Sequence, residues 1–214
     1  MEKDSSMMEK KCCDITKMKD KHIVTAEYRQ YLNPAKGTVS ELAQNGFILD
    51  EQAMEFALKF GNFPKLYYYQ QLGTLAGDQY VSLYGLGLKE KYLKDFVKHP
   101  NIIVAPYVEV GIGFYQLSVT RNVNSNSIQS ALNGQIQENR LDNFSITGDL
   151  GLQLGFTFGI LGSQVHLSAV GGYQTNLPSN WKTGHSLAFK EKLDLSSAYF
   201  GGKLSVYLVG CCKE

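Results

Sequence analysis

The segment from Asn143 to Ile160, NFSITGDLGLQLGFTFGI, constrains the fold more than any other part of the chain. Its even positions are apolar residues or Gly, and its odd positions from Ser145 to Thr157 are Ser, Thr, Asp, Gln or Gly. Successive side chains of a strand point to opposite faces, so this period of two predicts one long β-strand. A helix would place polar residues beside the leucines, and its glycines would weaken it.

The same alternation recurs over 52–61, 105–119, 164–174 and 198–208, and more weakly over 80–88. The face opposite the bulky apolar one consists mostly of Gly, Ser, Thr and Gln with isolated charges. A soluble sandwich would expose a face rich in Lys, Glu and Thr. The interior of a narrow barrel instead needs small groups, because bulky side chains from every strand cannot share it. We therefore expect an all-β fold, an antiparallel up-and-down transmembrane β-barrel.

The number of strands depends on the N-terminal third. Ile23–Leu32 is compatible with a first strand or a short helix, and 40–49 with a helical turn in a loop. Lys65–Leu72 reads as a separate strand after a turn at 61–64, or as the continuation of one strand bent at Pro64. Counting both segments as strands gives about eight. A short turn near 159–163 lies between two long polar connections, an asymmetry typical of outer-membrane barrels.

Three segments in the last 110 residues or so carry a resemblance: GDLGLQLGFTFGI, VHLSAVGGYQTNLPSNW and SSAYFGGKLSVYL. They resemble the closing strands of outer-membrane β-barrel proteins common in Bacteroidota. In that family a Gly-Tyr strand leads to an Asn-Leu-Pro loop and then to a final Tyr/Phe-Gly-x-x-Leu strand. The resemblance implies a barrel in the bacterial outer membrane, with membrane lipid as its surroundings.

We expect a polar N-terminal tail over 1–21, a barrel domain over 22–209 and a C-terminal tail over 210–214. The first segment, MEKDSSMMEKKCCDITKMKDK, lacks the apolar core and cleavage site of a secretory signal, so outer-membrane localisation requires a signal peptide not present in it. The cysteines form two vicinal pairs, Cys12-Cys13 and Cys211-Cys212, without C-x-x-C spacing. We expect free thiols there in preference to a disulfide between the chain ends.

Six charged or titratable residues are predicted to face the barrel interior: Glu55, Lys59, Glu109, Asp149, His166 and Lys203. They could form a polar lumen or binding site, but a structural network of ion pairs is the favoured interpretation, because opposite charges must pair in a narrow interior. His166 and Ser168 share a strand face, in a His-x-Ser arrangement used by an outer-membrane lipid A deacylase. Their apolar neighbours take the lipid side, which places this pair inside and disfavours that enzyme.

The aromatic residues near predicted strand ends fit an interfacial girdle better than stacking on a carbohydrate or other ligand. Trp181 is the exception, because it lies in a predicted loop and could face outward. No metal-ligand spacing or phosphate-binding loop is present in the sequence, so we expect no cofactor, no metal and no enzymatic activity. A net charge of +1 argues against nucleic acid. The predicted function is a non-enzymatic outer-membrane barrel with a structural, surface-interaction or narrow-conduit role, and an extracellular ligand at loops 122–142 and 178–192. The alternatives are a soluble or periplasmic barrel that binds a small apolar ligand, and a lipid-modifying enzyme.

Overall fold

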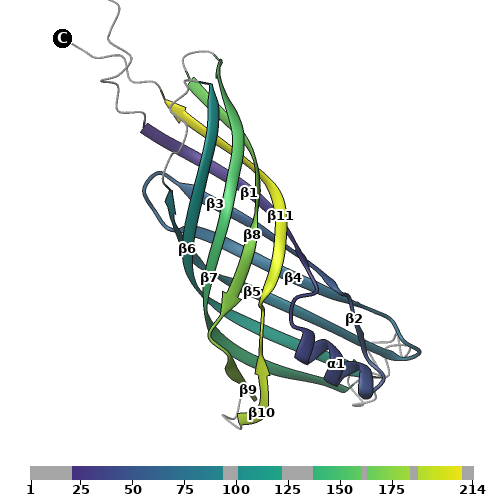
Figure 1. Cartoon of the computed structure of the whole chain (residues 1–214). Coiled ribbons are helices and arrows are strands. Elements are labelled where there is room, and N and C mark those ends of the chain that lie inside the picture. Colours follow the sequence, from purple (N-terminus) through teal and green to yellow (C-terminus); the bar gives the residue numbers. More distant parts are fainter. Residues whose placement is uncertain (1–20, 94–100, 122–136, 161–162, 184–187, 209–214) are drawn as a thin grey trace, which may run out of the picture.

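Eight antiparallel strands form the wall of the protein in a computed structural model, which describes residues 21–93, 101–121, 137–160, 163–183 and 188–208 (Figure 1). In chain order they are β1 (Lys21–Leu32), β3 (Gln52–Phe60), β4 (Lys65–Thr74), β5 (Gln79–Leu93), β6 (Ile102–Arg121), β7 (Gln137–Ile160), β8 (Ser163–Asn176) and β11 (Ser197–Leu208). The predicted tail at 210–214 and residues 1–20 of the predicted tail at 1–21, and with them both cysteine pairs, lie outside the described residues, whereas Lys21 is the first residue of β1.

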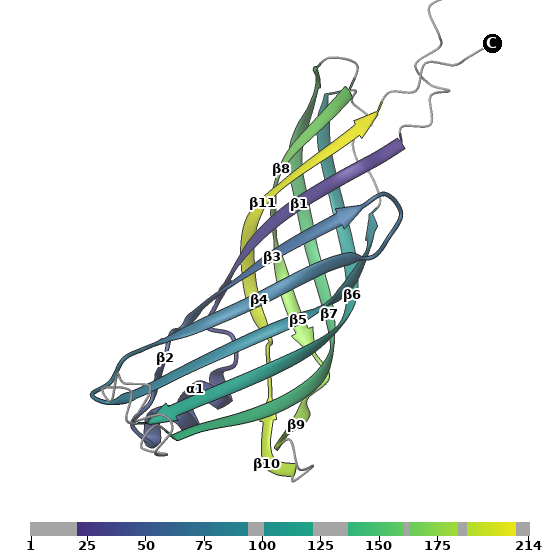
Figure 2. The same ribbon diagram turned by 180° about the vertical axis from the view of Figure 1, so that it is seen from behind.

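The wall closes on itself, which confirms the predicted up-and-down barrel of about eight strands. Each strand pairs with the next along the chain from β3 to β8, and β8 pairs with β11. β1 closes the seam between β11 and β3, in register from Lys21↔Leu208 to Leu32↔Ala198 apart from one bulge near His22 (Figure 2). No strand edge is left open in the wall, because every one of the eight strands has a partner on both sides.

The structure decides the alternatives in the N-terminal third. The segment 23–32 belongs to a strand, and 65–72 forms β4, separate from β3. The turn between those two strands contains Gly61 at φ +53°, in the left-handed region that favours glycine. Instead of a single helical turn, the connection from β1 to β3 contains α1 (Lys36–Gln44) and β2 (Ile48–Leu49), and β2 pairs with β4.

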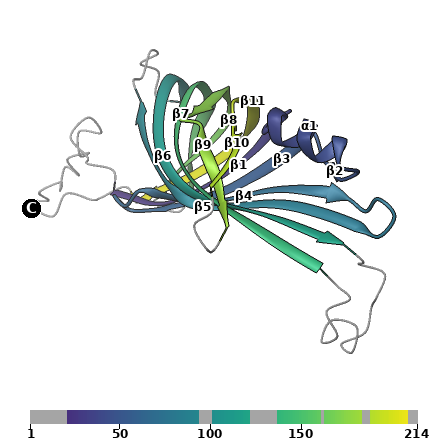
Figure 3. The same ribbon diagram turned by 90° about the horizontal axis from the view of Figure 1, so that it is seen from below.

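The two ends of the barrel differ. The end with the short β3–β4 turn also holds the start of β1 and the end of β11. The opposite end holds α1, β2 and a hairpin of β9 (Ser179–Thr183) and β10 (Ala188–Leu193) (Figures 1 and 3). We call them the short-turn end and the long-loop end. In the described residues no helix is long and apolar enough to cross a membrane, a criterion that does not concern strands.

The loops predicted at 122–142 and 178–192 differ from the structure. Residues 137–142 of the loop expected at 122–142 continue β7, paired with β6 and, at Leu141 and Asp142, with β9. The loop expected at 178–192 is mostly the β9–β10 hairpin. Period-two alternation missed the hairpin because its strands are short. Residues 122–136 and 184–187 lie outside the described part of the chain.

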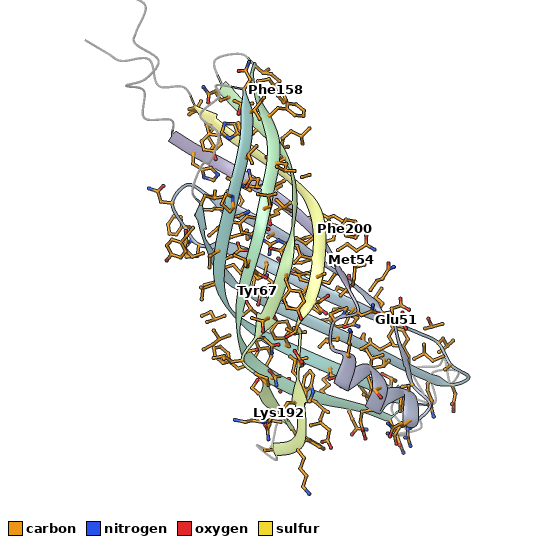
Figure 4. All side chains as sticks on the ribbon, viewed as in Figure 1. Glu51, Met54, Tyr67, Phe158, Lys192 and Phe200 are labelled. Atoms are coloured by element: carbon orange, nitrogen blue, oxygen red, sulfur yellow. The ribbon has the colours of Figure 1, made fainter. Side chains whose placement is uncertain are left out.

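The faces predicted for β3, β6, β7, β8 and β11 agree with the exposure of the side chains in those strands. In β7 the even residues from Phe144 to Ile160 point outward, and the odd residues from Asn143 to Gln153 are buried or half-buried. In β3 the outward residues are Met54, Phe56, Leu58 and Phe60. Figure 4 shows the side chains along the barrel, with Phe158 labelled at the short-turn end and Lys192 at the long-loop end. The apolar face thus lies outside the barrel and the polar face lies inside.

Candidate functional site

A cluster of buried charges fills the middle of the barrel, centred on Arg29 of β1. Its guanidinium is fully buried and donates to Glu27 (Nε–Oε1 2.5 Å), to Glu109 and to Asp149 (Nη1–Oδ2 3.4 Å). It also lies 4.7 Å from the centre of the Tyr199 ring. These partners come from β1, β6, β7 and β11, so one side chain ties together strands from all round the wall.

Lys89 of β5 forms the second node of this cluster, on the side toward the long-loop end. Its ammonium donates to Glu55 at 2.7 Å and to Gln174 at 2.9 Å, and it lies 3.5 Å from Asp149. The Tyr31 hydroxyl lies within hydrogen-bond distance of the same two acceptors, at 3.1 and 3.0 Å. Each of these side chains is less than 5 % exposed, so their charges can be accommodated only through this pairing.

Tyrosines form most of the remaining interior, which corrects the predicted aromatic girdle. Phe114, Phe144, Tyr173 and Phe200 do point outward. The following side chains are instead buried: Tyr67, Tyr69, Tyr115, Trp181 and Tyr199, together with Tyr31 and Tyr107. Their hydroxyls pair with one another, Tyr67 with Tyr115 at 2.8 Å and Tyr107 with Tyr199 at 2.6 Å. The odd-numbered residues of this part of β6 face inward, so the alternation that predicts Glu109 inside also predicts Tyr107 and Tyr115 inside.

The inward glycines are the counterpart of these rings. A Cβ at Gly113 would lie 1.9 Å from the Tyr67 hydroxyl oxygen, and one at Gly151 would lie 2.5 Å from Cζ of Tyr107. Such distances do not occur between real atoms, so each ring occupies the space that another strand leaves by lacking a side chain. The Gly-rich inner face predicted from sequence is therefore filled by tyrosines and charged groups.

The six predicted interior residues fall into two groups. Glu55, Glu109, Asp149 and Lys203 are buried inside the barrel, and the first three belong to the central cluster. Lys59 lies at the short-turn end, where its ammonium is 3.0 Å from Glu90 and a quarter of its side chain is exposed. His166 is half-buried near the same end, and its ring centre is 4.4 Å from that of Tyr207.

Sequence reasoning missed other members of the cluster, among them Glu27, Arg29, Lys65 and Lys89. The sequence around Glu27 and Arg29 is compatible with a strand or a helix, so it does not show which face of a strand these two side chains occupy. Ser168, of the His-x-Ser pair, is 4 % exposed and its hydroxyl accepts a hydrogen bond from Gln153 at 3.0 Å. That buried position matches the predicted inward placement of Ser168.

The short-turn end opens into a cavity of about 220 Å³ surrounded by lysines, which we call the basic vestibule. Lys65 pairs with Glu27 at 3.3 Å and with Glu109 at 2.5 Å, so it joins the vestibule to the central cluster. Lys91 lies 3.9 Å from Glu27, and Lys203 donates to Gln153 at 3.2 Å. The lining residues are His22, Thr25, Glu27, Lys59, Gly61, Asn62, Lys65, Lys91, Leu93, Lys203 and Tyr207.

An apolar cap closes the interior at the long-loop end. Trp181 of β9 is 2 % exposed and belongs to the same buried cluster as Leu193 and Leu195. Asn176 fixes the chain here: its amide donates to Ser145 and to the Leu193 carbonyl, both at 3.0 Å, and its carbonyl oxygen accepts from the Leu195 amide at 2.6 Å. The cap therefore holds the β9–β10 hairpin over the barrel.

A second cavity, of about 270 Å³, lies beside this cap between α1 and the hairpin. Its floor is apolar, with Leu117, Leu141, Trp181 and Phe189 among its lining residues, and Glu41 and Glu191 contribute carboxylates. The predicted ligand region at 178–192 therefore contributes to a real depression at the long-loop end. Among the described residues, no group of His, Cys, Asp or Glu side chains could hold a metal ion.

The fold defines the chain as a closed, antiparallel eight-stranded β-barrel with a charged interior and an apolar exterior. No family model and no curated protein matches the sequence. The features that bear on its function are the apolar outer face, the charged inner face and the cavities at the two ends of the barrel.

Proposed function

We propose that the chain is an outer-membrane-type β-barrel that sits in a lipid bilayer and presents its long-loop end for surface interaction, with no conducting role. The observation that carries the proposal is the apolar belt, the band of exposed apolar side chains round the outer wall. In β6 every outward residue from Ile102 to Phe114 is apolar, and in β7 every outward residue from Phe144 to Ile160 is apolar or Gly. A water-soluble wall would carry polar groups at these positions.

The belt has an aligned boundary toward the long-loop end. Phe114 pairs with Phe144, and the next outward pair is polar, with Gln116 donating to Asp142 at 3.1 Å. Beyond it Arg140 donates two hydrogen bonds to Glu138, which lower the pKa of that carboxyl. An aromatic pair followed by charged groups is the usual sequence of side chains where a barrel leaves the hydrocarbon region.

The height of the belt fits a bilayer. At about 3.3 Å per residue, Ile102 to Phe114 covers about 40 Å along β6. A strand tilt of about 40° reduces this to about 30 Å along the barrel axis, close to the thickness of a hydrocarbon core. The same arrangement disfavours a soluble barrel with a small apolar ligand inside, because the described interior residues place buried charges and tyrosines where such a ligand would lie.

The interior also disfavours a conduit. Arg29, Tyr31 and Lys89 are each no more than 1 % exposed, and they occupy the middle of the barrel. Eight strands enclose a space that side chains can fill completely. We assign these groups the structural role of holding the wall together, and we place the surface interaction at the cap and the cavity beside it.

The experiment compares two leucines in a chain refolded from denaturant into phospholipid vesicles. Leu150 pairs with Val108, midway along the β6 belt, and is 66 % exposed, whereas Leu75 is 51 % exposed in the β4–β5 turn at the long-loop end. Leu150→Arg should lower the free energy of unfolding by about 2–4 kcal/mol, and Leu75→Arg by about 0–1 kcal/mol.

In a soluble barrel both substitutions would change stability by no more than about 0.5 kcal/mol, since both side chains are already exposed. Wild-type refolding supplies a second measurement that needs no variant. Emission of Trp181, the one tryptophan of the chain, should shift to shorter wavelength with detergent or vesicles and not in buffer alone. A folded monomer in buffer, together with equal effects of the two substitutions, would contradict the membrane proposal.

A further inference from the structure

The basic vestibule contains more positive charge than the buried carboxylates can balance. Among the described residues, the buried interior holds five cations (Arg29, Lys65, Lys89, Lys91 and Lys203) and four carboxylates (Glu27, Glu55, Glu109 and Asp149). Arg29, Lys65 and Lys89 lie closest to those carboxylates and pair with all four. The excess charge therefore falls at the short-turn end.

Lys91 and Lys203 share a single neutral acceptor. The side-chain oxygen of Gln153 accepts from Lys203 at 3.2 Å and from Lys91 at 3.5 Å. The only carboxylate within 4 Å of either ammonium among the ion pairs of the described residues is Glu27, 3.9 Å from Lys91, and Glu27 is already paired with Arg29 and Lys65. Lys91 also lies 3.6 Å from the centre of the Tyr107 ring. Both side chains are about nine-tenths buried, so water compensates their charges poorly.

We propose that the basic vestibule binds a phosphate-class oxyanion, coordinated by Lys91 and Lys203 with Lys65 behind them. An ammonium group has three donors, so each lysine has hydrogen-bonding capacity beyond Gln153. A cavity of about 220 Å³ has room for a phosphate group with a few waters. Lys59 also lines the cavity, and a quarter of its side chain is exposed.

Two kinds of ligand carry this phosphate chemistry, free phosphate and the phosphate of a lipid headgroup. The site is built entirely from side chains inside the barrel, so it does not depend on the membrane proposal. If the chain folds in buffer without detergent, the binding experiment is carried out there, and the two proposals can fail separately.

The experiment titrates inorganic phosphate into the full chain folded in micelles of an uncharged detergent. Binding is followed by isothermal calorimetry and by the ³¹P NMR signal, with chloride at equal ionic strength as the reference. Phosphate should bind and raise the unfolding temperature beyond the chloride reference. Lys91→Gln and Lys203→Gln should each weaken binding about tenfold or more, because each removes a charge-assisted hydrogen bond. Lys190→Gln is the matched control, since Lys190 is exposed on β10 at the other end.

A second arm distinguishes the sources. The chain is placed in phosphatidylcholine vesicles with and without phosphatidic acid, and thermal unfolding is recorded. Stabilisation by free phosphate identifies the free anion as the ligand, and stabilisation by phosphatidic acid alone identifies a lipid headgroup. The proposal is overturned if neither stabilises the wild-type chain beyond the chloride reference, or if Lys190→Gln weakens binding as much as Lys203→Gln. The NMR titration of the wild-type chain decides the matter even if a variant does not fold.

Discussion

The fit between inward glycines and tyrosines can be tested by adding one carbon atom. Gly113→Ala would place a Cβ 1.9 Å from the hydroxyl oxygen of Tyr67. A carbon–oxygen contact needs about 3.3 Å, so the Tyr67 ring would have to move by more than 1 Å. It is 1 % exposed, and its hydroxyl pairs with Tyr115 at 2.8 Å. Overpacking costs about 1–3 kcal/mol and loss of the hydrogen bond about 1 kcal/mol, against a gain of about 0.5–1 kcal/mol from replacing Gly in a strand.

We therefore expect Gly113→Ala to destabilise the barrel by about 1–3 kcal/mol. The control is Gly148→Ala in β7, because a Cβ there meets only Thr175 Cγ2 at 3.9 Å. That change should be neutral or stabilising by up to about 1 kcal/mol. Both are measured by urea unfolding in vesicles.

A double-mutant cycle isolates the contact itself. In a Tyr67→Phe background the hydroxyl is gone, so Gly113→Ala should cost at least about 1 kcal/mol less than it does in the wild-type chain. If Gly113→Ala is as harmless as Gly148→Ala, or if Tyr67→Phe gives no relief, the inner face is not packed as the structure has it.

Two further substitutions and one measurement on the wild-type protein test the other parts of the interior. Arg29→Met removes a hydrogen-bond donor from each of three buried carboxylates and should lower the free energy of unfolding in urea by about 3–5 kcal/mol. A decrease of less than about 1 kcal/mol would mean that water reaches the cluster. Asn176→Ala removes the hydrogen bonds that hold the β10 segment and should make Trp181 more accessible to acrylamide quenching, whereas unchanged quenching would show that apolar packing alone keeps the cap closed. Wild-type protein in planar bilayers should give no steady conductance, and a stable open channel would refute the filled interior.

Much of the barrel could be predicted from sequence because alternation is a local property. A long strand such as 143–160 shows its two faces directly, and those faces fixed the inward position of Asp149 before any pairing partner was known. The same parity, applied to 105–119, placed Glu109 inside. What could not be predicted is the pairing between distant strands, since Arg29 meets Glu109 and Asp149 only after the wall closes.

The tyrosines show a second limit of the same kind. A Tyr near a strand end is equally compatible with an interfacial girdle and with an inward ring, and only the cross-strand neighbour decides between them. Tyr67 points inward next to Gly113, two strands away, whereas Tyr68 is exposed beside Leu86. Small inward residues on one strand were therefore informative about large residues on another, a signal that a strand-by-strand reading does not use.

The two ends of the interior differ in chemistry, so the surface-interaction proposal and the anion-binding proposal concern different ends of the barrel. The long-loop end is closed by an apolar cap around Trp181, whereas the short-turn end carries unbalanced lysines. A filled barrel needs only balanced charges to hold its wall together, and four of the five buried cations balance the four buried carboxylates. The fifth positive charge lies beyond that requirement, and Lys91 and Lys203 incur a desolvation cost that their shared acceptor Gln153 and, for Lys91, the Tyr107 ring offset only in part. If the vestibule binds no anion, replacing Lys203 by Gln should leave the barrel as stable or more so; an anion-dependent loss of stability in that variant would instead tie those charges to a ligand.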